Sequence, residues 1–349
     1  MTQRIPFSGH PIFLGPLAES LPGWLDEQGY SSVFLIADKN TNRLCRPALP
    51  VQSAEAFVVG ETAHAGIPME TLKTLPSCEA IWQAMFEARL DRKALVVNLG
   101  GGVVGDMGGF CAATYKRGVD FIQIPTTLLA MTDAAIGGKL GVDFQGAKNA
   151  VGVFQYPAAV FIDPVFLKTL PARELRSGFA EVIKHALIGD RALWKKIQSM
   201  PAGSLAATNW GGLLADSIAV KTKIVAEDPR EAGIRALLNF GHTIGHALES
   251  YFLKTAEPLT HGEAVAIGML CECPDAAELA ETILHFFPHR HIPETAFPDL
   301  WKLMEQDKKN ASGTVRMAVP DAEPFSMRWV ALNPAEAFGR LQRYNLLSK

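Results

Sequence analysis

The sequence predicts two domains, an α/β domain over residues 1–170 and an all-α domain over residues 171–349. Short apolar runs rich in β-branched residues recur in the first half, and each ends in polar residues or glycine, which is typical of buried parallel strands. After Pro171 the apolar residues repeat with helical spacing instead. The length of 349 residues fits two domains, at roughly 150 residues per domain.

Four segments of the first half are predicted strands: 32–37, 94–99, 119–124 and 158–163. Between the first two, residues 77–90 place Ile81, Met85 and Leu90 near one face of a helix. This mixture of buried strands and helix makes the first half α/β.

The second half carries helical periodicity over residues 172–200, 211–227, 235–252 and 262–285, with almost no convincing strand. We place the domain boundary near residue 170, to within several residues. The sequence contains no internal repeat and no low-complexity tract.

Composition excludes several function classes. The 33 Lys and Arg against 36 Asp and Glu leave a formal charge of −3, so no overall field favours nucleic acid or an anionic membrane surface. No apolar run of about 18 residues could span a membrane, and the first residues lack a secretory signal pattern. Five irregularly spaced cysteines indicate reduced, mostly buried thiols. We therefore expect a cytoplasmic protein.

A glycine-rich turn follows the strand at 94–99. Residues 100–106 contain glycines at the spacing G-x-G-x-x-G, which lets backbone amides approach a pyrophosphate at the start of the next helix. The turn could also be only a tight connection, because Asp120, the acidic residue at the usual distance, begins the next strand instead of ending it. Asp38 ends an earlier strand and could accept a ribose hydroxyl, or could be an exposed turn residue.

Histidines and a glutamate form a candidate metal site. His242 and His246 are four residues apart and share one helix face, a spacing found in zinc sites and also in structural pairs. His261, at the expected start of the next helix, could supply a third ligand. Glu181, in an otherwise apolar helix, would complete a catalytic set with an open position, unless it only forms an ion pair with Lys184 one turn on.

Basic and amide side chains beside glycines suggest an anionic ligand. Arg117, Lys139 and the pair Lys148 and Asn149 each lie next to glycine or turn residues. Each could equally be a solvated surface residue, but together with the glycine turn they indicate a phosphorylated small molecule beside a nucleotide. Further donors are Lys221, Arg235, Asn239, Lys308 and Lys309.

In the order of its motifs the chain resembles the 3-dehydroquinate synthase family of sugar-phosphate cyclases, over about residues 30–315. The most specific blocks are GGGVVGD (100–106), RGVDFIQIPTTLL (117–129), GGK (137–139), KN (148–149), LPARELRSGFAEVIKHALI (170–188), LNFGHTIGHALE (238–249) and HGEAVAIGM (261–269). The resemblance implies an NAD-binding first domain, one divalent metal, zinc or cobalt, and an active site in the cleft between the domains. It also implies a homodimer that acts on a small-molecule sugar phosphate.

The resemblance divides the candidate residues by role. The implied metal ligands are Glu181, His242 and His261, so that His246 is not a ligand. The implied catalytic and phosphate-binding residues are Lys139, Asn149, Lys184, His246, Asn239 and Arg117, the last of which can come from a neighbouring subunit. The implied substrate-binding residues are Asp133, Lys221, Arg235, Lys308 and Lys309. The implied NAD-binding residues are Asp38, Asn40, Glu70, Lys73, Gly102, Val103, Val104, Gly105, Asp106, Thr126, Thr127, Lys139, Lys148, Phe166, Leu167, Lys168 and Thr169.

Two features depart from the family pattern. Met69 stands where a glycine usually precedes the motif glutamate, which would restrict that turn to negative φ. The segment after Met269 is about ten residues shorter than usual.

The implied reaction converts 3-deoxy-D-arabino-heptulosonate 7-phosphate to 3-dehydroquinate and phosphate, through transient oxidation by NAD, phosphate elimination, reduction and intramolecular aldol closure. One alternative is a cyclase of a neutral sugar phosphate, which would not need Lys221 and Arg235 for a carboxylate. A metal-dependent polyol dehydrogenase would not need the phosphate-binding residues. A degenerate NAD-binding module would be expected to have lost some of them.

Overall fold

The computed structural model describes residues 1–7, 9–51, 55–61, 68–145, 147–306 and 314–347. The chain forms two compact units. The first comprises Met1–Pro171 and Trp210–Ala215, and the second comprises Ala172–Asn209 and Asp216–Lys349. Lys308 and Lys309, which the sequence analysis expected to reach the substrate, lie outside the described residues.

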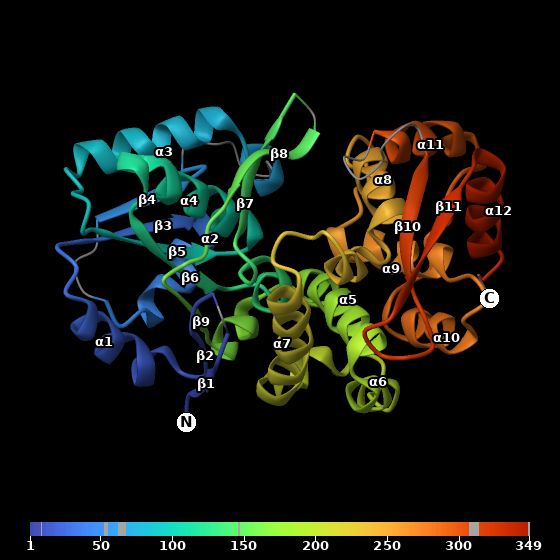
Figure 1. Ribbon diagram of the computed structural model, residues 1–349, viewed down its shortest axis with the longest axis horizontal. Helices are drawn as coiled ribbons and strands as arrows, with labels where there is room; N and C mark the ends of the chain where they lie inside the picture. The colour runs from blue at the N-terminus through green and yellow to red at the C-terminus, as the bar shows by residue number, and fades with distance from the viewer. Residues whose placement is uncertain (8, 52–54, 62–67, 146, 307–313, 348–349) are drawn as a thin grey trace. The chain divides into compact units, whose positions relative to one another are not determined.

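A seven-stranded sheet forms the centre of the first unit (Figure 1). Only the edge strand β1 runs antiparallel to its neighbour. In spatial order the strands are β1 (Gln3–Ile5), β2 (Ile12–Leu14), β9 (Ala159–Ile162), β6 (Asp120–Pro125), β5 (Leu95–Gly100), β3 (Val33–Asp38) and β4 (Glu55–Val59). The four predicted strands are confirmed as β3, β5, β6 and β9. β1, β2 and β4 are too short or too exposed to give a periodic signal.

Helices cover both faces of this sheet. α1 (Leu17–Gln28) lies on one face, and α3 (Leu75–Glu87) and α4 (Gly102–Thr114) lie on the other (Figure 1). The helix expected at 77–90 is α3, which buries Ile81 and Met85 in a core shared with α4 and the central strands. All residues of β5 are buried, as expected of a strand covered on both faces.

The connections of the sheet change direction between β3 and β5. β3 leads outward to β4 at the edge, and the chain then returns to β5 on the other side of β3. Ligands of open α/β sheets bind beyond the carboxyl ends of the strands at such a reversal. Asp38 ends β3 and Gly100 ends β5, so the topology brings the glycine turn and Asp38 to neighbouring strand ends.

A separate hairpin in the first unit was not predicted. β7 (Lys139–Phe144) and β8 (Ala147–Phe154) pair antiparallel, after a π-helical turn, η4 (Ala130–Ala134). Most β8 residues are at least partly exposed and polar residues and glycine interrupt its apolar positions, so no period of two stands out in the sequence. This hairpin carries several of the candidate basic residues.

The second unit is mainly helical, as predicted. Its helices are α5 (Ala172–Gly189), α6 (Arg191–Gln198), α7 (Trp210–Glu227, of which the first residues group with the first unit), α8 (His242–Phe252), α9 (His261–Glu272), α10 (Ala277–Phe286), α11 (Phe297–Glu305) and α12 (Pro334–Asn345). The predicted helix at 172–200 breaks at Asp190, whose carboxylate caps α6 by accepting from the amides of Ala192 and Leu193. The predicted helix at 235–252 begins as a 3₁₀ turn, η7 (Ile234–Asn239).

The prediction of an all-α second domain misses one hairpin. β10 (Val315–Pro320) and β11 (Met327–Leu332) form an antiparallel hairpin there. Val315, Met317 and Val319 alternate and are buried, but β11 is exposed along most of its length and Pro320 ends the first strand. With one short buried strand beside one exposed strand, the sequence gives too weak a pattern to be recognised.

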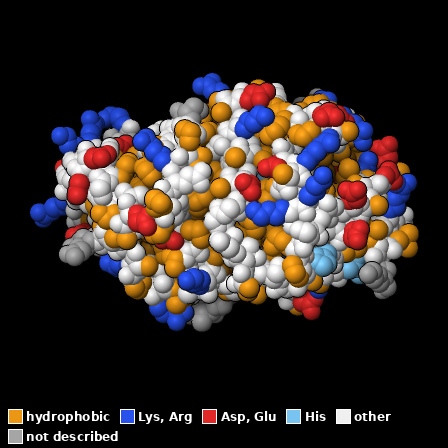
Figure 2. Space-filling model, turned by 90° about the horizontal axis from the view of Figure 1, so that it is seen from below, with side chains coloured by type: hydrophobic (Ala, Val, Ile, Leu, Met, Phe, Trp, Pro, Cys, Tyr) orange, Lys and Arg blue, Asp and Glu red, His pale blue; other side chains and the backbone are white. Residues whose placement is uncertain are grey.

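Among the described residues, no helix is long and apolar enough to cross a membrane. On the face that Figure 2 presents, Lys and Arg side chains lie among acidic and neutral ones. All five cysteines are described and none forms a disulfide, which confirms the expected free thiols, and four of them are buried.

Candidate functional site

The glycine turn connects β5 to α4, with Gly102 as the first helical residue. No side chain caps the start of this helix, so its first amides have the arrangement that binds anions. Gly105 also serves packing, because a Cβ there would come within 3.0 Å of Gln123 Oε1 on β6. The turn is therefore a tight connection that also presents an uncapped helix N-terminus. A small hollow beside it is lined by Gly100, Gly101, Gly102, Gly105, Gln123, Pro125, Ala130, Ala134 and Ala135.

Asp38 is buried, so it is not the exposed turn residue that the sequence left open. Its Oδ1 accepts from the amides of Asn40, at 2.8 Å, and Thr41, at 3.0 Å, and thereby caps α2 (Lys39–Leu44). On the other side of the glycine turn, the Thr126 amide donates to the Gly100 carbonyl at 2.9 Å, and Thr127 follows it. The expected nucleotide-binding residues Asp38, Asn40, Thr126 and Thr127 thus follow the carboxyl ends of β3 and β6, which flank β5.

A charged cluster links the segment from Glu70 to Lys73 with helix α4 and strand β8. Lys73 is 4% exposed, and its Nζ donates to Asp106 Oδ2 and to Asn149 Oδ1, each at 2.6 Å. Burial disfavours the ammonium, but the carboxylates of Asp106 and Glu70 outweigh burial and hold the pKa of Lys73 above its ordinary value. Glu70 in turn pairs with Lys148 at 3.2 Å. The structure therefore brings together residues that the sequence assigned to NAD and to phosphate.

Met69 does not disrupt this cluster. It begins a 3₁₀ turn, η2 (Met69–Leu72), preceded by Pro68, and it is not among the residues with positive φ. The turn lets Glu70 pair with Lys148 and Lys73 pair with Asp106, without the glycine usual at this position.

The remaining expected residues of the first unit fall on three elements. Asp133 lies in η4, and Lys139 is the exposed first residue of β7. The segment from Phe166 to Thr169 belongs to η5 (Pro164–Thr169). Phe166 and Leu167 are buried in the core, so their side chains face away from solvent, whereas Lys168 and Thr169 are exposed.

Arg117 lies at the amino-terminal end of the parallel strands, whereas the glycine turn lies at their carboxyl end. It follows the carboxyl end of α4 and precedes the start of β6, whereas the glycine turn follows the end of the parallel strand β5. It is exposed, with φ of 69°, beside Lys116 at 49°. At about 3.3 Å per residue, the six-residue strand separates the two ends by roughly 20 Å. The first unit thus does not bring its own Arg117 to the turn.

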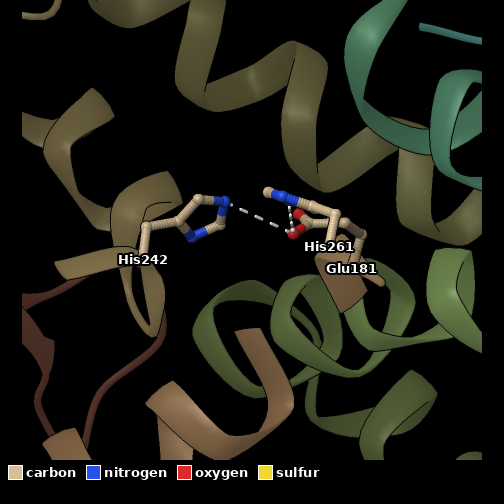
Figure 3. A group of neighbouring side chains, drawn as sticks. All are labelled: Glu181, His242 and His261. Carbon is tan, nitrogen blue, oxygen red and sulfur yellow. Dashed lines mark ion pairs between the residues drawn. The ribbon is translucent and has the colours of Figure 1, made fainter. Parts of the chain in front are cut away.

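The second unit brings Glu181, His242 and His261 together from α5, α8 and α9 (Figure 3). Glu181 Oε1 lies 3.6 Å from Nε2 of His242 and 3.9 Å from Nε2 of His261. Glu181 is completely buried; its Oε1 has no hydrogen-bond partner, and its Oε2 forms an ion pair with Lys184. The distances are too long for hydrogen bonds and leave space among three ligand atoms.

In each histidine, the contact made by Nδ1 indicates that Nε2 is the nitrogen available to bind a metal. His242 Nδ1 lies 3.1 Å from the Phe240 carbonyl, so it carries the proton and leaves the Nε2 lone pair directed at Glu181. His261 Nδ1 lies 3.2 Å from Glu249 Oε2, the carboxylate–histidine arrangement that orients metal ligands. The three candidate ligand atoms lie within 4.8 Å of one another, close enough to share one cation. These residues therefore fit a divalent metal.

His246 also belongs to this cluster. Its ring centroid is 5.1 Å from that of His242 and 6.0 Å from that of His261, and with Glu249 and His261 it forms a second possible ligand set. Glu181 is the more deeply buried carboxylate, and the oxygen that faces the two histidines, Oε1, has no hydrogen-bond partner, whereas Glu249 already contacts His261 Nδ1. The geometry thus favours the set that contains Glu181. Glu249 was not predicted as a site residue, although its position seven residues after His242 places it on the same helix face.

Lys184 forms the ion pair with Glu181 that the sequence left open, and its Nζ also donates to the Leu238 carbonyl at 2.6 Å. Both partners of the pair are buried. His185, which the sequence analysis assigned no role, lies on the other side of Glu181, with Nε2 at 4.0 Å from Oε2 and Nδ1 at 2.8 Å from Ser217 Oγ. Only the fold reveals His185, because a buried histidine in an apolar helix carries no distinctive sequence signal.

The other expected residues of the second unit are held by the loop before α8. Arg235 is buried, and its Nη1 donates to the Pro229 carbonyl at 2.5 Å. Asn239 Nδ2 donates to Glu231 Oε1, also in this loop. Lys221 is buried on α7.

Both parts of the chain match the domains of a known protein family. Residues 66–177 match the N-terminal domain of 3-dehydroquinate synthase, and residues 178–310 match its C-terminal domain. The 3-dehydroquinate synthase of Halorhodospira halophila is 42% identical over 334 residues, 89% of each chain.

Two solved structures share the fold. A 2-deoxy-scyllo-inosose synthase, complexed with carbaglucose-6-phosphate, NAD+ and Co2+, gives a TM-score of 0.81 at 20% identity, over 98% of this chain and 99% of that one. A 2-epi-5-epi-valiolone synthase from Streptomyces hygroscopicus, with NAD+ and Zn2+ bound, gives 0.80 at 24% identity, over 99% of both.

Proposed function

The chain belongs to the 3-dehydroquinate synthase family, and we propose that it converts 3-deoxy-D-arabino-heptulosonate 7-phosphate to 3-dehydroquinate and phosphate. The observation that carries the proposal is the buried Glu181 carboxylate, whose Oε1 has no hydrogen-bond partner and faces the Nε2 atoms of His242 and His261. A binding module without catalysis would have no use for such a set.

NAD and one divalent metal are the proposed cofactors. Two imidazole nitrogens and one carboxylate oxygen suit zinc or cobalt and leave a coordination position open to substrate. The uncapped start of α4, with Asp38 at the neighbouring strand end, suits a dinucleotide. When bound, NAD supplies reversible hydride transfer and the metal supplies Lewis-acid polarisation of the substrate hydroxyl.

The polar residues of both units would bind and orient the substrate. Lys184 is held between Glu181 and the Leu238 carbonyl, so its ammonium is fixed near the metal ligands and can serve the leaving phosphate. Arg235 has its guanidinium held by the Pro229 carbonyl, which pre-orients a planar donor for the substrate carboxylate. The other proposed contacts are Lys139, Asn149, Asn239 and His246 for phosphate, and Asp133 and Lys221 for the rest of the substrate.

Arg117 would act in a second copy of the chain. Its place at the amino-terminal end of the sheet in its own unit argues against service at its own glycine turn. A homodimer in which each Arg117 completes the partner's phosphate site reconciles this position with the proposed role. We also propose a cytoplasmic location, which the free thiols support.

The reaction is tested by measuring phosphate release from 3-deoxy-D-arabino-heptulosonate 7-phosphate by metal-stripped protein, with NAD+, Zn2+ and Co2+ added separately and together. We expect release only with NAD+ plus metal, and no net NADH. Accumulating NADH would indicate a polyol dehydrogenase. Release from glucose 6-phosphate, and none from the carboxylate-bearing substrate, would indicate a neutral-sugar cyclase and overturn the proposal.

The shared site is tested by mixing two variants. Arg117→Ala and His261→Ala should each be inactive, but a refolded equimolar mixture should recover about a quarter of wild-type activity, because half of its dimers contain one intact site. If Arg117 serves its own chain, mixing restores nothing.

A further inference from the structure

The amino terminus of α8, the helix that carries His242, is capped by a side chain from another helix. Glu272, the last residue of α9, accepts the Gly241 amide on Oε2 at 2.9 Å and the Ile244 amide on Oε1 at 3.1 Å. Both oxygens of one carboxylate thus hold the backbone on either side of His242. No local side chain performs this function, because the residue before the helix is Gly241.

Close packing explains why the cap comes from α9. Gly241 has φ of 80°, and a Cβ there would lie 2.6 Å from Met269 Cγ and 2.9 Å from the Val265 carbonyl. A Cβ on Gly268 would overlap the Gly241 carbonyl. The first turn of α8 therefore lies directly on α9, where a serine or aspartate cap before His242 has no room.

Glu272 is 2% exposed, and burial of a carboxylate is costly unless it is compensated. Its two amide donors and the positive end of the α8 dipole provide that compensation. Arg340 of α12 donates to the Cys271 and Glu272 carbonyls at 3.0 and 2.9 Å, which holds the end of α9 in place.

α9 consequently controls two of the candidate metal ligands. Its first residue is His261, and its last residue fixes the turn from which His242 projects. The rotation of the His242 ring about its backbone determines whether Nε2 faces Glu181, and the Gly241 and Ile244 amides lie on either side of that backbone. Any loosening of this turn would spread the three ligand atoms.

We propose that Glu272 is a positioning residue for the metal centre, acting through the backbone of His242 and not by touching metal or substrate. The proposal rests on the proposed metal-dependent function, since it requires that His242 bind the ion. It predicts that loss of the Glu272 charge weakens metal binding and distorts the coordination, while the protein stays folded.

The test measures Co2+ binding to metal-free protein, by titration calorimetry and by the visible absorption of the bound ion, without any assay of activity. Glu272→Gln keeps the size of the side chain but turns an amide NH2 toward one backbone donor. We expect Co2+ affinity to fall about 10- to 100-fold, as when residues that orient ligands are replaced, with altered absorption bands. Glu281→Gln, on the exposed side of α10, is the control and should match the wild type.

The outcomes separate the two proposals. If wild-type protein binds no Co2+, the metal centre itself is wrong and the role of Glu272 falls with it. If wild-type protein binds Co2+ and folded Glu272→Gln binds it with the same affinity and spectrum, only the positioning role is overturned. Should Glu272→Gln fail to fold, Glu272→Asp keeps the charge but is one methylene shorter; we expect partial loss of affinity and faster hydrogen exchange of the Ile244 amide. Wild-type values for both would again overturn the role.

Discussion

The charged residues expected at the ligand site of the first unit pair with one another, whereas the expected metal ligands of the second unit bring two ring nitrogens near a carboxylate oxygen that has no hydrogen-bond partner. In the first unit, Lys73 satisfies Asp106 and Asn149. In the second, Glu181 has Lys184 on one oxygen and two imidazoles too distant for hydrogen bonds near the other.

This difference shows two ways of preparing a binding site. A neutralised cluster can hold loops in place and leave recognition of a dinucleotide to backbone amides, which carry no net charge. The proposed metal ligands instead place two ring nitrogens 3.6 and 3.9 Å from one carboxylate oxygen, an arrangement in which a bound ion would add stability to the folded state. The first arrangement is stable without ligand, and the second gains its full stability only with the ion.

The largest expected effect comes from removing the central carboxylate of the second unit. Glu181→Gln should abolish stoichiometric metal binding and lower kcat/KM roughly 1,000-fold or more, because several kcal/mol of Lewis-acid stabilisation are lost. Metal content by mass spectrometry of the intact protein and steady-state kinetics provide the measurement. Glu174→Gln, exposed on the same helix, is the control. A Glu181→Gln protein with full metal content would contradict the ligand assignment.

Breaking the cluster of the first unit should cost stability. Lys73→Met leaves the Asp106 carboxylate, whose side chain is 17% exposed, without its cation, and we expect a cost of about 3 kcal/mol, the lower end for a broken buried pair. Urea unfolding followed by fluorescence measures the loss. The double variant Lys73→Met with Asp106→Leu should recover much of it, because no buried charge remains. If Lys73→Met lowers the free energy of unfolding by less than about 1 kcal/mol, the charged cluster around Lys73 does not stabilise the first unit as we expect.

The helix packing that supports the metal ligands can be disrupted by one methyl group. A Cβ on Gly262, next to His261, would overlap the Ser177 carbonyl of α5, so Gly262→Ala should cost about 3 kcal/mol and weaken metal binding. Gly339→Ala on α12 is the matched control, because nothing lies within 4 Å of its Cβ, and it should stabilise by about 0.5–1 kcal/mol. Equal stability of the two variants would show that α5 and α9 can separate without cost.

The smallest expected effect concerns pH. Burial acts to raise the pKa of Glu263, but hydrogen bonds from Arg173 and the Thr260 amide outweigh it and hold that pKa below its ordinary value of 4.5. A lowered folded-state pKa stabilises the protein above pH 4.5, and this contribution is lost as pH falls through the folded value. Because Arg173 is half exposed, we expect only about 1 kcal/mol.

Unfolding curves of wild type and Glu263→Gln at pH 6 and pH 3 measure the stability that the ionised Glu263 carboxylate contributes. The difference in the free energy of unfolding between wild type and Glu263→Gln should be present at pH 6 and become smaller toward pH 3. A difference that widens on acidification would show that Glu263 is not stabilised as a carboxylate.

Much of the fold could be predicted from local pattern. The four central strands have ends one residue from those expected, since a fully buried strand gives a continuous apolar run between polar ends. The hairpins at β7–β8 and β10–β11 were missed because their strands are partly exposed and interrupted by glycine or proline. The break at Asp190 was missed because the apolar period continues on both sides of it.

By itself, the sequence determined the family and the glycine turn, and through the family resemblance it predicted three metal ligands, since these depend on residue type and order along the chain. Only the tertiary structure decided how the side chains meet. It placed Arg117 at the amino-terminal end of the sheet, paired Lys73 with Asp106, turned Glu249 onto His261, and turned Glu272 onto the backbone amides on either side of His242. The physical reason is that burial and hydrogen bonding are set by residues distant in sequence, and no local pattern records which of them will meet.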